Sequence, residues 1–275
     1  MLGHQLFCEL RRRHEVRVTL RQGRNTSSAY SVFSPSEIYE QVEMHAPDRL
    51  LDVATDFRPA VIINAVGIVK QRPMAAQSIP SLEINALLPH RLALLARAVN
   101  ARLLHFSTDC VFSGRRGGYS EEDTPDPTDL YGRSKLLGEL DGTGCLTLRT
   151  SVIGHELERR TSLVEWLLSQ PGHVHGFRQA VFSGFTTIEM ARIVETLIVK
   201  YPDAHGIWHV SSEPIDKFNL LNLIKKHYGL TTEIIPDDEF RCDRSLNSAR
   251  FRERFGYRPP SWESMIGEMS DAGRS

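Results

Sequence analysis

The feature that most constrains the fold of this chain is its alternation of apolar, strand-like runs with amphipathic, helix-like stretches. Residues 59–67 (PAVIINAVG) form a nearly continuous apolar run, which is typical of a strand buried on both faces. Residues 80–99 then carry leucines at helical spacing, and the strand-like run RLLHFSTD follows. Such an alternation predicts an α/β fold with a parallel, doubly wound sheet and right-handed crossovers.

The same rhythm extends in both directions along the chain. Residues 15–20 (EVRVTL) are rich in β-branched side chains and predict a strand, and residues 47–57 have the apolar spacing of a helix. A loop rich in Gly, Asp and Pro separates RLLHFSTD from a short helix near 130–140, which leads into the strand-like run CLTLRTSVI. We therefore expect the sheet domain to occupy residues 1–150.

After about residue 150 the rhythm becomes irregular. Helices are expected near 162–169, 187–200 and 216–228, and GIWHVS and TTEIIPDD read as strands. We expect this smaller portion, residues 151–275, to cover the carboxyl ends of the sheet strands, where such folds bind ligands. Some of its elements should return to the sheet.

Composition narrows the function classes. A formal net charge of -1 gives no electrostatic argument for nucleic acid or for an anionic membrane. The four cysteines are far apart, which argues against a disulfide framework or a zinc ribbon and fits a reducing compartment. No apolar stretch approaches the ~20 residues that span a bilayer, so we expect a cytoplasmic protein. His173 and His175 alternate as on a strand, but two histidines do not make a metal site, and no metal is expected.

Two stretches carry the chemistry, FSTDCVFSG and YGRSK. The first places Ser107, Thr108 and Asp109 at the carboxyl end of a buried strand. The second places Tyr131 and Lys135 one helical turn apart on the same face. A tyrosine with its ordinary pKa of ~10 is a poor acid–base catalyst at neutral pH, whereas a nearby ammonium group lowers that pKa. A hydroxyl on the facing strand end can hold a substrate carbonyl against the phenol.

A Tyr-x-x-x-Lys motif alone is weak, because many surface helices contain one by chance. On its own it indicates a tyrosine packed along a helix beside a solvated lysine. When it follows Ser-Thr-Asp at a strand end in an alternating α/β chain, the same motif favours a catalytic site.

These stretches together resemble an extended short-chain dehydrogenase/reductase, most closely the dTDP-4-dehydrorhamnose reductase branch. The matching stretches run through nearly the whole chain: MLGHQL, INAVGIV, NALLPHRLA, FSTDCVFSG, YGRSKLLGE, LRTSVIG, FSGFTT and DRSLNSARF…GYRPPSW. The resemblance implies a Rossmann-type NAD(P)-binding domain over 1–150 and a mainly substrate-binding portion over 151–275. It also implies NADPH-dependent reduction of the C4 keto group of a nucleotide-linked 4-keto-6-deoxyhexose, in deoxysugar and polysaccharide biosynthesis.

Carried over to matching positions, the resemblance implies a role for each residue of the constellation. Tyr131 would protonate the keto oxygen as hydride reaches the carbonyl carbon. Lys135 would lower the pKa of the tyrosine and bind the nicotinamide ribose, and Thr108 would hold the keto oxygen. Asp109 is a weaker candidate for substrate contact, since it is as readily a loop cap.

The chain opens with half of the family's phosphate-binding turn. In the family, a first strand leads into Gly-x-x-Gly-x-x-Gly, whose backbone lets a pyrophosphate approach a helix N-terminus. Gly3 matches the third glycine, with His4 beside it, whereas the first two glycines and the strand before them have no counterpart in this sequence. We expect that the sequence as given starts at an internal methionine of a longer chain. The alternative is that the sheet lacks its central strand.

The residues after the second expected strand bear on the choice of cofactor. Arg21 and Arg24 stand where an acidic residue would bind ribose hydroxyls, and guanidinium groups suit a 2′-phosphate. NADPH is therefore expected, with NADH as the alternative if both arginines are only solvated loop residues. The other expected cofactor contacts are Asn64, Ala65, Val66, Gly67, Ser107, Tyr131 and Lys135.

The second portion should bind a nucleotide sugar. Arg178 and Arg244 are candidate diphosphate contacts, although either could be a surface arginine. Val152 stands where the rhamnose enzymes typically carry Trp, so a related 4-keto-6-deoxy sugar on UDP or GDP is an alternative substrate. A homodimer is possible.

Two rival functions remain. A branch of the same family serves as a regulatory subunit of methionine adenosyltransferase and binds a partner enzyme instead of turning over a substrate. An epimerase of the same fold is the second rival. It needs tightly held NAD, which Arg21 disfavours.

Overall fold

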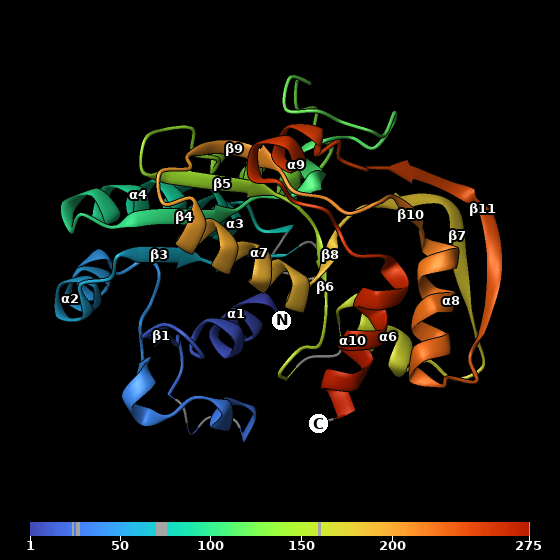
Figure 1. Ribbon diagram of the computed structural model, residues 1–275, viewed down its shortest axis with the longest axis horizontal. Coiled ribbons are helices and arrows are strands. Elements are labelled where there is room, and N and C mark those ends of the chain that lie inside the picture. Colours follow the sequence, from blue (N-terminus) through green and yellow to red (C-terminus); the bar gives the residue numbers. More distant parts are fainter. Residues whose placement is uncertain (24, 26–27, 70–75, 159–160, 275) are drawn as a thin grey trace.

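The computed structural model describes residues 1–23, 25, 28–69, 76–158 and 161–274 (Figure 1). It confirms the predicted α/β fold. A parallel four-stranded sheet has the order β3-β4-β5-β9, and β9 returns to it from the second half of the chain. Its strands are β3 (Val61–Asn64), β4 (Arg102–Phe106), β5 (Cys145–Arg149) and β9 (Gly206–His209).

A separate two-stranded parallel sheet lies beside this main sheet. It consists of β1 (Val18–Thr19) and β2 (Ile38–Tyr39). The strand predicted over residues 15–20 is therefore reduced to two residues. Its only ladder partner among the described residues is β2, and a strand that lacks a neighbour on one side loses half of its backbone hydrogen bonds.

The helix predicted over residues 80–99 has three parts: α3 (Ser78–Ser81), the π-helical η5 (Leu82–Leu87) and α4 (Leu88–Ala98). Pro89 explains part of the irregularity, because it has no N–H to donate to the Asn85 carbonyl. Gly138 packs on that same carbonyl, where an added Cβ would lie 2.0 Å from the oxygen.

The helices cover both faces of the sheet, and β4 shows how. Leu104 and Phe106 point into the larger core cluster, which contains residues of α1 and α7, while Leu103 points into the cluster built with α4. This is the period-two alternation of a strand buried on both faces. The other helices of this half are α1 (Leu2–Leu10), α2 (Pro47–Phe57), α5 (Leu130–Leu137) and α7 (Thr187–Lys200).

The second portion is built around a three-stranded sheet in the order β10-β7-β11. Its strands are β7 (His173–Phe182), β10 (Ile215–Asp216) and β11 (Glu233–Asp243). The remaining elements are β6 (Val152–Ile153), β8 (Phe185–Thr186), α6 (Leu163–Leu168), α8 (Lys217–Tyr228), α9 (Ala249–Phe255) and α10 (Trp262–Arg274).

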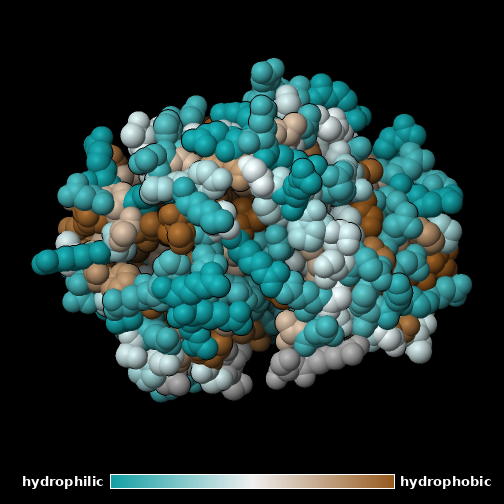
Figure 2. All heavy atoms as spheres, viewed as in Figure 1, coloured by the Kyte–Doolittle hydropathy of each residue, from teal (hydrophilic) through white to brown (hydrophobic). Residues whose placement is uncertain are grey.

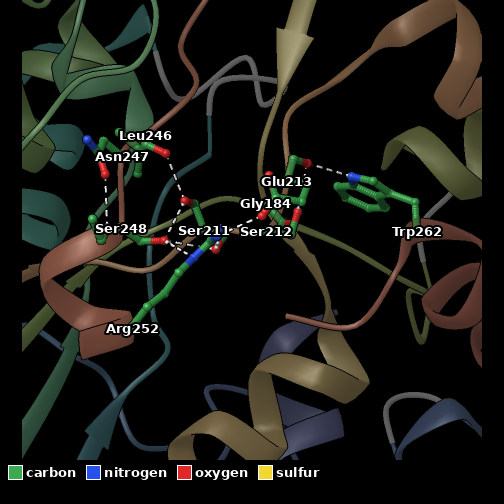
Figure 3. Close-up of polar contacts among 10 residues, drawn as sticks. Gly184, Ser211, Ser212, Glu213, Leu246, Asn247, Ser248, Arg252 and Trp262 are labelled. Carbon is green, nitrogen blue, oxygen red and sulfur yellow. Dashed lines mark hydrogen bonds and ion pairs between the residues drawn. The ribbon is translucent and has the colours of Figure 1, made fainter. Parts of the chain in front are cut away.

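A polar network after β9 joins distant segments of residues 151–275 to one another (Figure 3). Ser211 Oγ donates to the Leu246 carbonyl (2.8 Å) and Ser212 Oγ donates to the Gly184 carbonyl (2.6 Å). Trp262 Nε1 donates to the Glu213 carbonyl (2.7 Å), so this tryptophan packs in the core with its polar edge satisfied. The network holds Leu246 and Ser248, which follow Arg244 in the chain.

Two further properties of the described residues concern membrane-spanning helices and the state of the cysteines. None of their helices is both long and apolar enough to cross a membrane. The cysteines at positions 8, 110, 145 and 242 are all free thiols.

We expect Leu148→Ala to destabilise the protein by about 2–5 kcal/mol, because Leu148 is fully buried in β5 and its removal leaves a cavity. Leu94→Ala is the control. Leu94 is 61% exposed, so its truncation should change the free energy of unfolding by at most about 0.5 kcal/mol. Urea denaturation of both variants measures the difference, and equal losses would contradict the assignment of the core.

Candidate active site

The turn after β4 presents the first half of the site. Thr108 is the N-cap of a single 3₁₀ turn (Asp109–Val111), and its Oγ1 accepts a hydrogen bond from Cys110 N (3.1 Å). The Thr108 hydroxyl also lies 3.2 Å from Asp109 Oδ1. Both side chains are buried at the carboxyl end of the strand, as the Ser-Thr-Asp pattern predicts.

The helix α5 presents the second half. Asp129 caps it by accepting from Gly132 N (2.8 Å). Gly132 lies directly against the β4 turn, because a Cβ there would come within 2.2 Å of the Cys110 carbonyl oxygen. This close approach brings Tyr131 to the Thr108 side chain, whose hydrogen bond acts on the pKa of the phenol. The structure therefore brings Thr108, Asp109 and Tyr131 together.

Burial dominates the protonation of this group. Removal from water raises the pKa of Tyr131, while the hydrogen bond from Thr108 acts in the opposite direction. Burial lowers the pKa of Lys135 to about 8, against the opposing effect of the Glu139 carboxylate. The Lys135 ammonium donates to the Phe106 carbonyl (2.5 Å). Burial therefore dominates the pKa of the phenol, and the lowering of that pKa by Lys135 stays a prediction.

A buried ionic network lies behind the site. Glu139 Oε1 accepts from Ser107 Oγ (2.6 Å), and its two oxygens accept from Arg149 Nε (2.8 Å) and Nη2 (2.7 Å). The side chains of Glu139 and Arg149 are only 4% and 6% exposed, so each charge depends on the other. His209 Nε2 lies 3.2 Å from Arg149 Nη1. The Ser107 hydroxyl is thus engaged by Glu139, and its predicted contact with a cofactor stays a prediction.

The loop after β3 joins the site through two asparagines. Asn64 is buried, with Nδ2 3.1 Å from His105 Nδ1 and Oδ1 accepting from Val66 N (3.1 Å). Asn85, in the π-helical segment, accepts from Ile68 N (2.9 Å) and donates to the Ile68 carbonyl (3.0 Å).

Asn85 also reaches the catalytic helix. Its Nδ2 donates to Ser134 Oγ (3.2 Å), which in turn donates to the Tyr131 carbonyl (2.9 Å). Gly67 lies beside the same amide, at an ordinary contact distance of 3.5 Å for an added Cβ. Ala65 and Val66, which directly precede Gly67 in the chain, are exposed. The predicted cofactor loop is therefore held to α5 by one side chain.

The N-terminal candidates have mixed outcomes. An added Cβ at Gly3 would lie 3.8 Å from Ala65 Cβ, an ordinary contact, and the predicted role of Gly3 in cofactor binding stays a prediction. Burial, with the N-terminal charge second, lowers the pKa of His4 to about 4, so its imidazole is neutral at pH 7. Arg21 is exposed just after β1, and Arg24 lies outside the described residues.

The two arginines proposed for a diphosphate differ in their surroundings. Arg178 forms an exposed ion pair with Asp238 across β7 and β11. Arg244 donates from Nε to the Phe112 carbonyl (2.9 Å) and acts electrostatically on Asp109. Burial raises the pKa of Asp109 despite this cation. The structure therefore brings Arg244, but not the Arg178 ion pair, into the field of the site.

Sequence reasoning missed a third cation, Lys217. It is the first residue of α8, and its Nζ lies 4.2 Å from the centroid of the Phe182 ring. Burial lowers its pKa to about 8, while Asp109 and Cys110 act in the opposite direction. The sequence offered only a lysine at a helix start, since α8 is remote in sequence from the β4 turn. Asn85 and Glu139 were not singled out as functional either.

Among the described residues, no group of three or more His, Cys, Asp or Glu side chains could hold a metal ion. The site instead combines a buried hydroxyl, a phenol and an ammonium at the carboxyl edge of a parallel sheet, a constellation suited to proton transfer at a carbonyl.

The fold and this site define the class of an extended short-chain dehydrogenase/reductase. Within that class, the chain belongs to the family described as the RmlD substrate binding domain, whose model matches residues 1–274.

Two structures show the likeness over nearly the whole chain. A hypothetical dTDP-4-dehydrorhamnose reductase of Sulfolobus tokodaii is 27% identical, with a TM-score of 0.76 and coverage of 96% of this chain and 95% of that one. The dTDP-4-dehydrorhamnose reductase of Bacillus anthracis, in complex with NADP, is 21% identical with the same TM-score and covers 94% of this chain and 100% of its own, a likeness of fold.

Curated relatives extend the comparison to another function. The dTDP-4-dehydrorhamnose reductase of Aggregatibacter actinomycetemcomitans is 25% identical over 255 residues, 83% of this chain and 86% of that protein. Methionine adenosyltransferase 2 subunit beta of Bos taurus is 34% identical, but only over 127 residues, 44% of this chain. The match spans 37% of the length of that relative.

We expect Glu139→Gln to cost about 3–5 kcal/mol of stability, because the variant leaves the Arg149 charge buried without a counterion. Glu268→Gln is the matched control, since Glu268 pairs with Arg192 at the surface and should contribute less than about 1 kcal/mol. The free energies of unfolding from urea titrations test this, and a similar loss in both variants would show that the Glu139–Arg149 pair has no special role.

Proposed function

We propose that the protein is an NADPH-dependent reductase of the C4 keto group of a nucleotide-linked 4-keto-6-deoxyhexose. The observation that carries the proposal is the juxtaposition of the Thr108 turn and Tyr131, fixed by the contact of Gly132 with the Cys110 carbonyl. It is supported by the family and by the likeness to dTDP-4-dehydrorhamnose reductases over most of the chain.

Lys135 provides a test of whether these residues fit a nicotinamide cofactor. Lys135 is 5% exposed as a residue, and its ammonium carries three donors, of which the Phe106 carbonyl takes one. A buried ammonium group needs further acceptors, and the two hydroxyls of a ribose supply them. The donor set therefore fits the ribose of a nicotinamide nucleotide, with Lys135 as the residue that holds it.

The reaction follows from the protonation states. When held there, a reduced nicotinamide would supply the hydride that the C4 carbon accepts. Because burial raises its pKa, Tyr131 is protonated at neutral pH and donates its phenolic proton to the developing alkoxide. The Thr108 hydroxyl, which points at Asp109 Oδ1 in the structure, would turn to donate a hydrogen bond to the same oxygen and so orient the carbonyl against the phenol. Lys135 then stabilises the phenolate that remains until a proton is regained from solvent.

The charges around the site support an anionic substrate and a phosphorylated cofactor. Arg244 and Lys217 both act on Asp109, so two positive charges converge on this part of the site, and we place the substrate diphosphate beside them. Arg21 favours NADPH over NADH, as the exposed cation just after β1. Whether dTDP, UDP or GDP carries the sugar is decided by assaying the three nucleotide sugars.

We expect Tyr131→Phe to lower kcat/KM about 10²–10⁴-fold, because the variant has no proton to donate. Turnover is measured as NADPH oxidation between about pH 7 and 9, with a nucleotide-linked 4-keto-6-deoxyhexose as the substrate. NADPH binding, measured by fluorescence titration, should be retained. Tyr39→Phe, which removes a surface phenol bonded to Asp56, is the matched control and should keep full activity. Undiminished turnover in Tyr131→Phe would refute the proposed acid.

The lowered pKa of Lys217 predicts a pH dependence of substrate binding. Above about pH 8 the ammonium loses its proton and its attraction for the diphosphate, so KM for the sugar nucleotide should rise about tenfold by pH 9.5. Lys217→Arg keeps its charge throughout this range. Its KM should therefore stay flat between pH 7 and 9.5. A rise in KM equal to that of the unmodified protein would assign the titration to another group.

A second candidate function has one specific observation in its favour. The 127-residue match to methionine adenosyltransferase 2 subunit beta is the more identical of the two curated matches above. A regulatory role for this chain predicts no NADPH oxidation with any of the three nucleotide sugars and a change in the kinetics of a methionine adenosyltransferase when the two proteins are mixed.

A further inference from the structure

One titratable group at the centre of the site has no role in the proposed reduction, the thiol of Cys110. It lies on the same 3₁₀ turn as Asp109, directly after Thr108, whose Oγ1 accepts from the Cys110 N–H (3.1 Å). The backbone of this residue is also fixed from the other side, since its carbonyl oxygen packs against Gly132 of α5. The thiol is therefore held beside the groups that we expect to bind the keto oxygen.

The surroundings of the thiol are polar, although they are buried. Figure 2 shows hydrophilic residues over most of the viewed face, whereas Thr108 and Asp109 are only 5% and 7% exposed. Buried polar groups that lie together in this way are typical of reaction sites. Cys110 also acts electrostatically on Tyr131 and on Lys217, so its thiol lies within reach of both halves of the site.

Cys110 and Asp109 interact directly. A hydrogen bond between the thiol and the carboxyl group acts on the pKa values of both. Cys110 is partly exposed and Asp109 is buried, so the thiol is the more accessible of the two groups to a substrate. The arrangement is that of a sulfur in front and a carboxylate that can take its proton behind.

The protonation of the two groups suits this arrangement. Burial raises the pKa of Cys110 to about 12, so the sulfur is a strong base once its proton has been removed. Burial also raises the pKa of Asp109, which makes its carboxylate a better proton acceptor than an exposed one. Two neighbouring groups of this kind can pass a proton between them and serve as acid and base in turn.

A ketone offers such a pair a second reaction besides reduction. The hydrogen atoms on the carbons next to a carbonyl are acidic, because the electron pair left by their removal is delocalised onto the carbonyl oxygen. In a 4-keto hexose these carbons are C3 and C5. The charge that develops on O4 is the same as in hydride transfer, so the donors that hold O4, Tyr131 and Thr108, stabilise both reactions.

We propose that Cys110, activated by Asp109, exchanges a hydrogen on the carbon next to the keto group with solvent, as a further activity of this site. The proposal rests on the proposed function, because it takes the same nucleotide-linked 4-keto sugar as the substrate. It adds Cys110 to the catalytic residues, since the sulfur would touch the reacting carbon through its hydrogen.

The step leaves the number of protons and electrons unchanged. Asp109 accepts the thiol proton while the sulfur takes the proton from C3 or C5. The electron pair of the broken C–H bond forms the C=C bond of an enol, and O4 takes the phenolic proton of Tyr131. The reverse transfers restore the ketone. Between the two, the protons on sulfur and carboxyl exchange with water, so solvent hydrogen enters the sugar.

The exchange is measured in D₂O with oxidised NADP, which supplies no hydride. Deuterium entering C3 or C5 of a nucleotide-linked 4-keto-6-deoxyhexose is followed by mass spectrometry and by loss of the matching proton NMR signal. We expect exchange at least about 10²-fold faster than in the same solution without protein. Because one sulfur both removes and returns the hydrogen, the carbon should keep its configuration.

Two variants test the residues of the pair. Cys110→Ser keeps the size of the side chain and a hydrogen bond to Asp109, but a hydroxyl is a much weaker acid than a thiol. Exchange should fall at least about tenfold in Cys110→Ser and in Asp109→Asn. The dissociation constant of the sugar nucleotide should change less than about threefold in Cys110→Ser, which a distorted site would not allow. Cys145→Ser, at the amino end of β5, is the matched control and should exchange like the unmodified protein.

The outcomes separate this proposal from the proposed function. Exchange no faster than without protein, or undiminished in Cys110→Ser, would overturn the proposal. Inversion at the exchanged carbon would also overturn it, because that requires a second group on the opposite face of the sugar. NADPH oxidation without exchange would leave the proposed function standing alone. Exchange without NADPH oxidation would support the pair and refute the reductase.

Discussion

The contact between Gly132 and the Cys110 carbonyl is the constraint on which the rest of the site depends. It sets the distance between a helix and a strand end that are otherwise independent elements, and it leaves no space for any side chain at position 132. Asn85 and Glu139 then hold the flanks of the same helix, one to the loop after β3 and the other to β5 through Arg149. The geometry of the hydroxyl and the phenol is therefore a property of backbone packing, held by polar side chains behind it.

Desolvation sets the protonation states of the groups in this site. Burial raises the pKa values of Tyr131 and Asp109 and lowers those of Lys135 and Lys217, so every group is shifted toward its uncharged form. A phenol that keeps its proton suits the delivery of a proton to an oxygen. The lysines titrate close to the working pH and so remain sensitive to any anion that binds beside them.

The sequence predicts those parts of the molecule that depend on local pattern. The helix at Tyr131 and the strand before Thr108 follow from periodicity and lie where expected. The shortness of β1 could not be foreseen, because it depends on which strands pair with it, and among the described residues only β2 does. The convergence of Lys217 on Asp109 likewise requires knowing how α8 packs on the first half of the chain. Arg178 pairs with Asp238 on a neighbouring strand, a contact that the sequence does not reveal, and its predicted contact with a diphosphate stays a prediction.

The π-helical segment Leu82–Leu87 has a consequence for how this chain can vary. A π-turn holds one residue more than an α-turn, and each residue of an α-helix advances the direction of its side chains by about 100°. The extra residue lets Asn85 face the loop while Leu88 and Leu92 still face the core. A point substitution in the segment changes one contact, whereas a one-residue deletion would rotate the amide away from the loop or the leucines out of the core. We therefore expect related proteins to keep the number of residues in this helix more strictly than the identity of those residues.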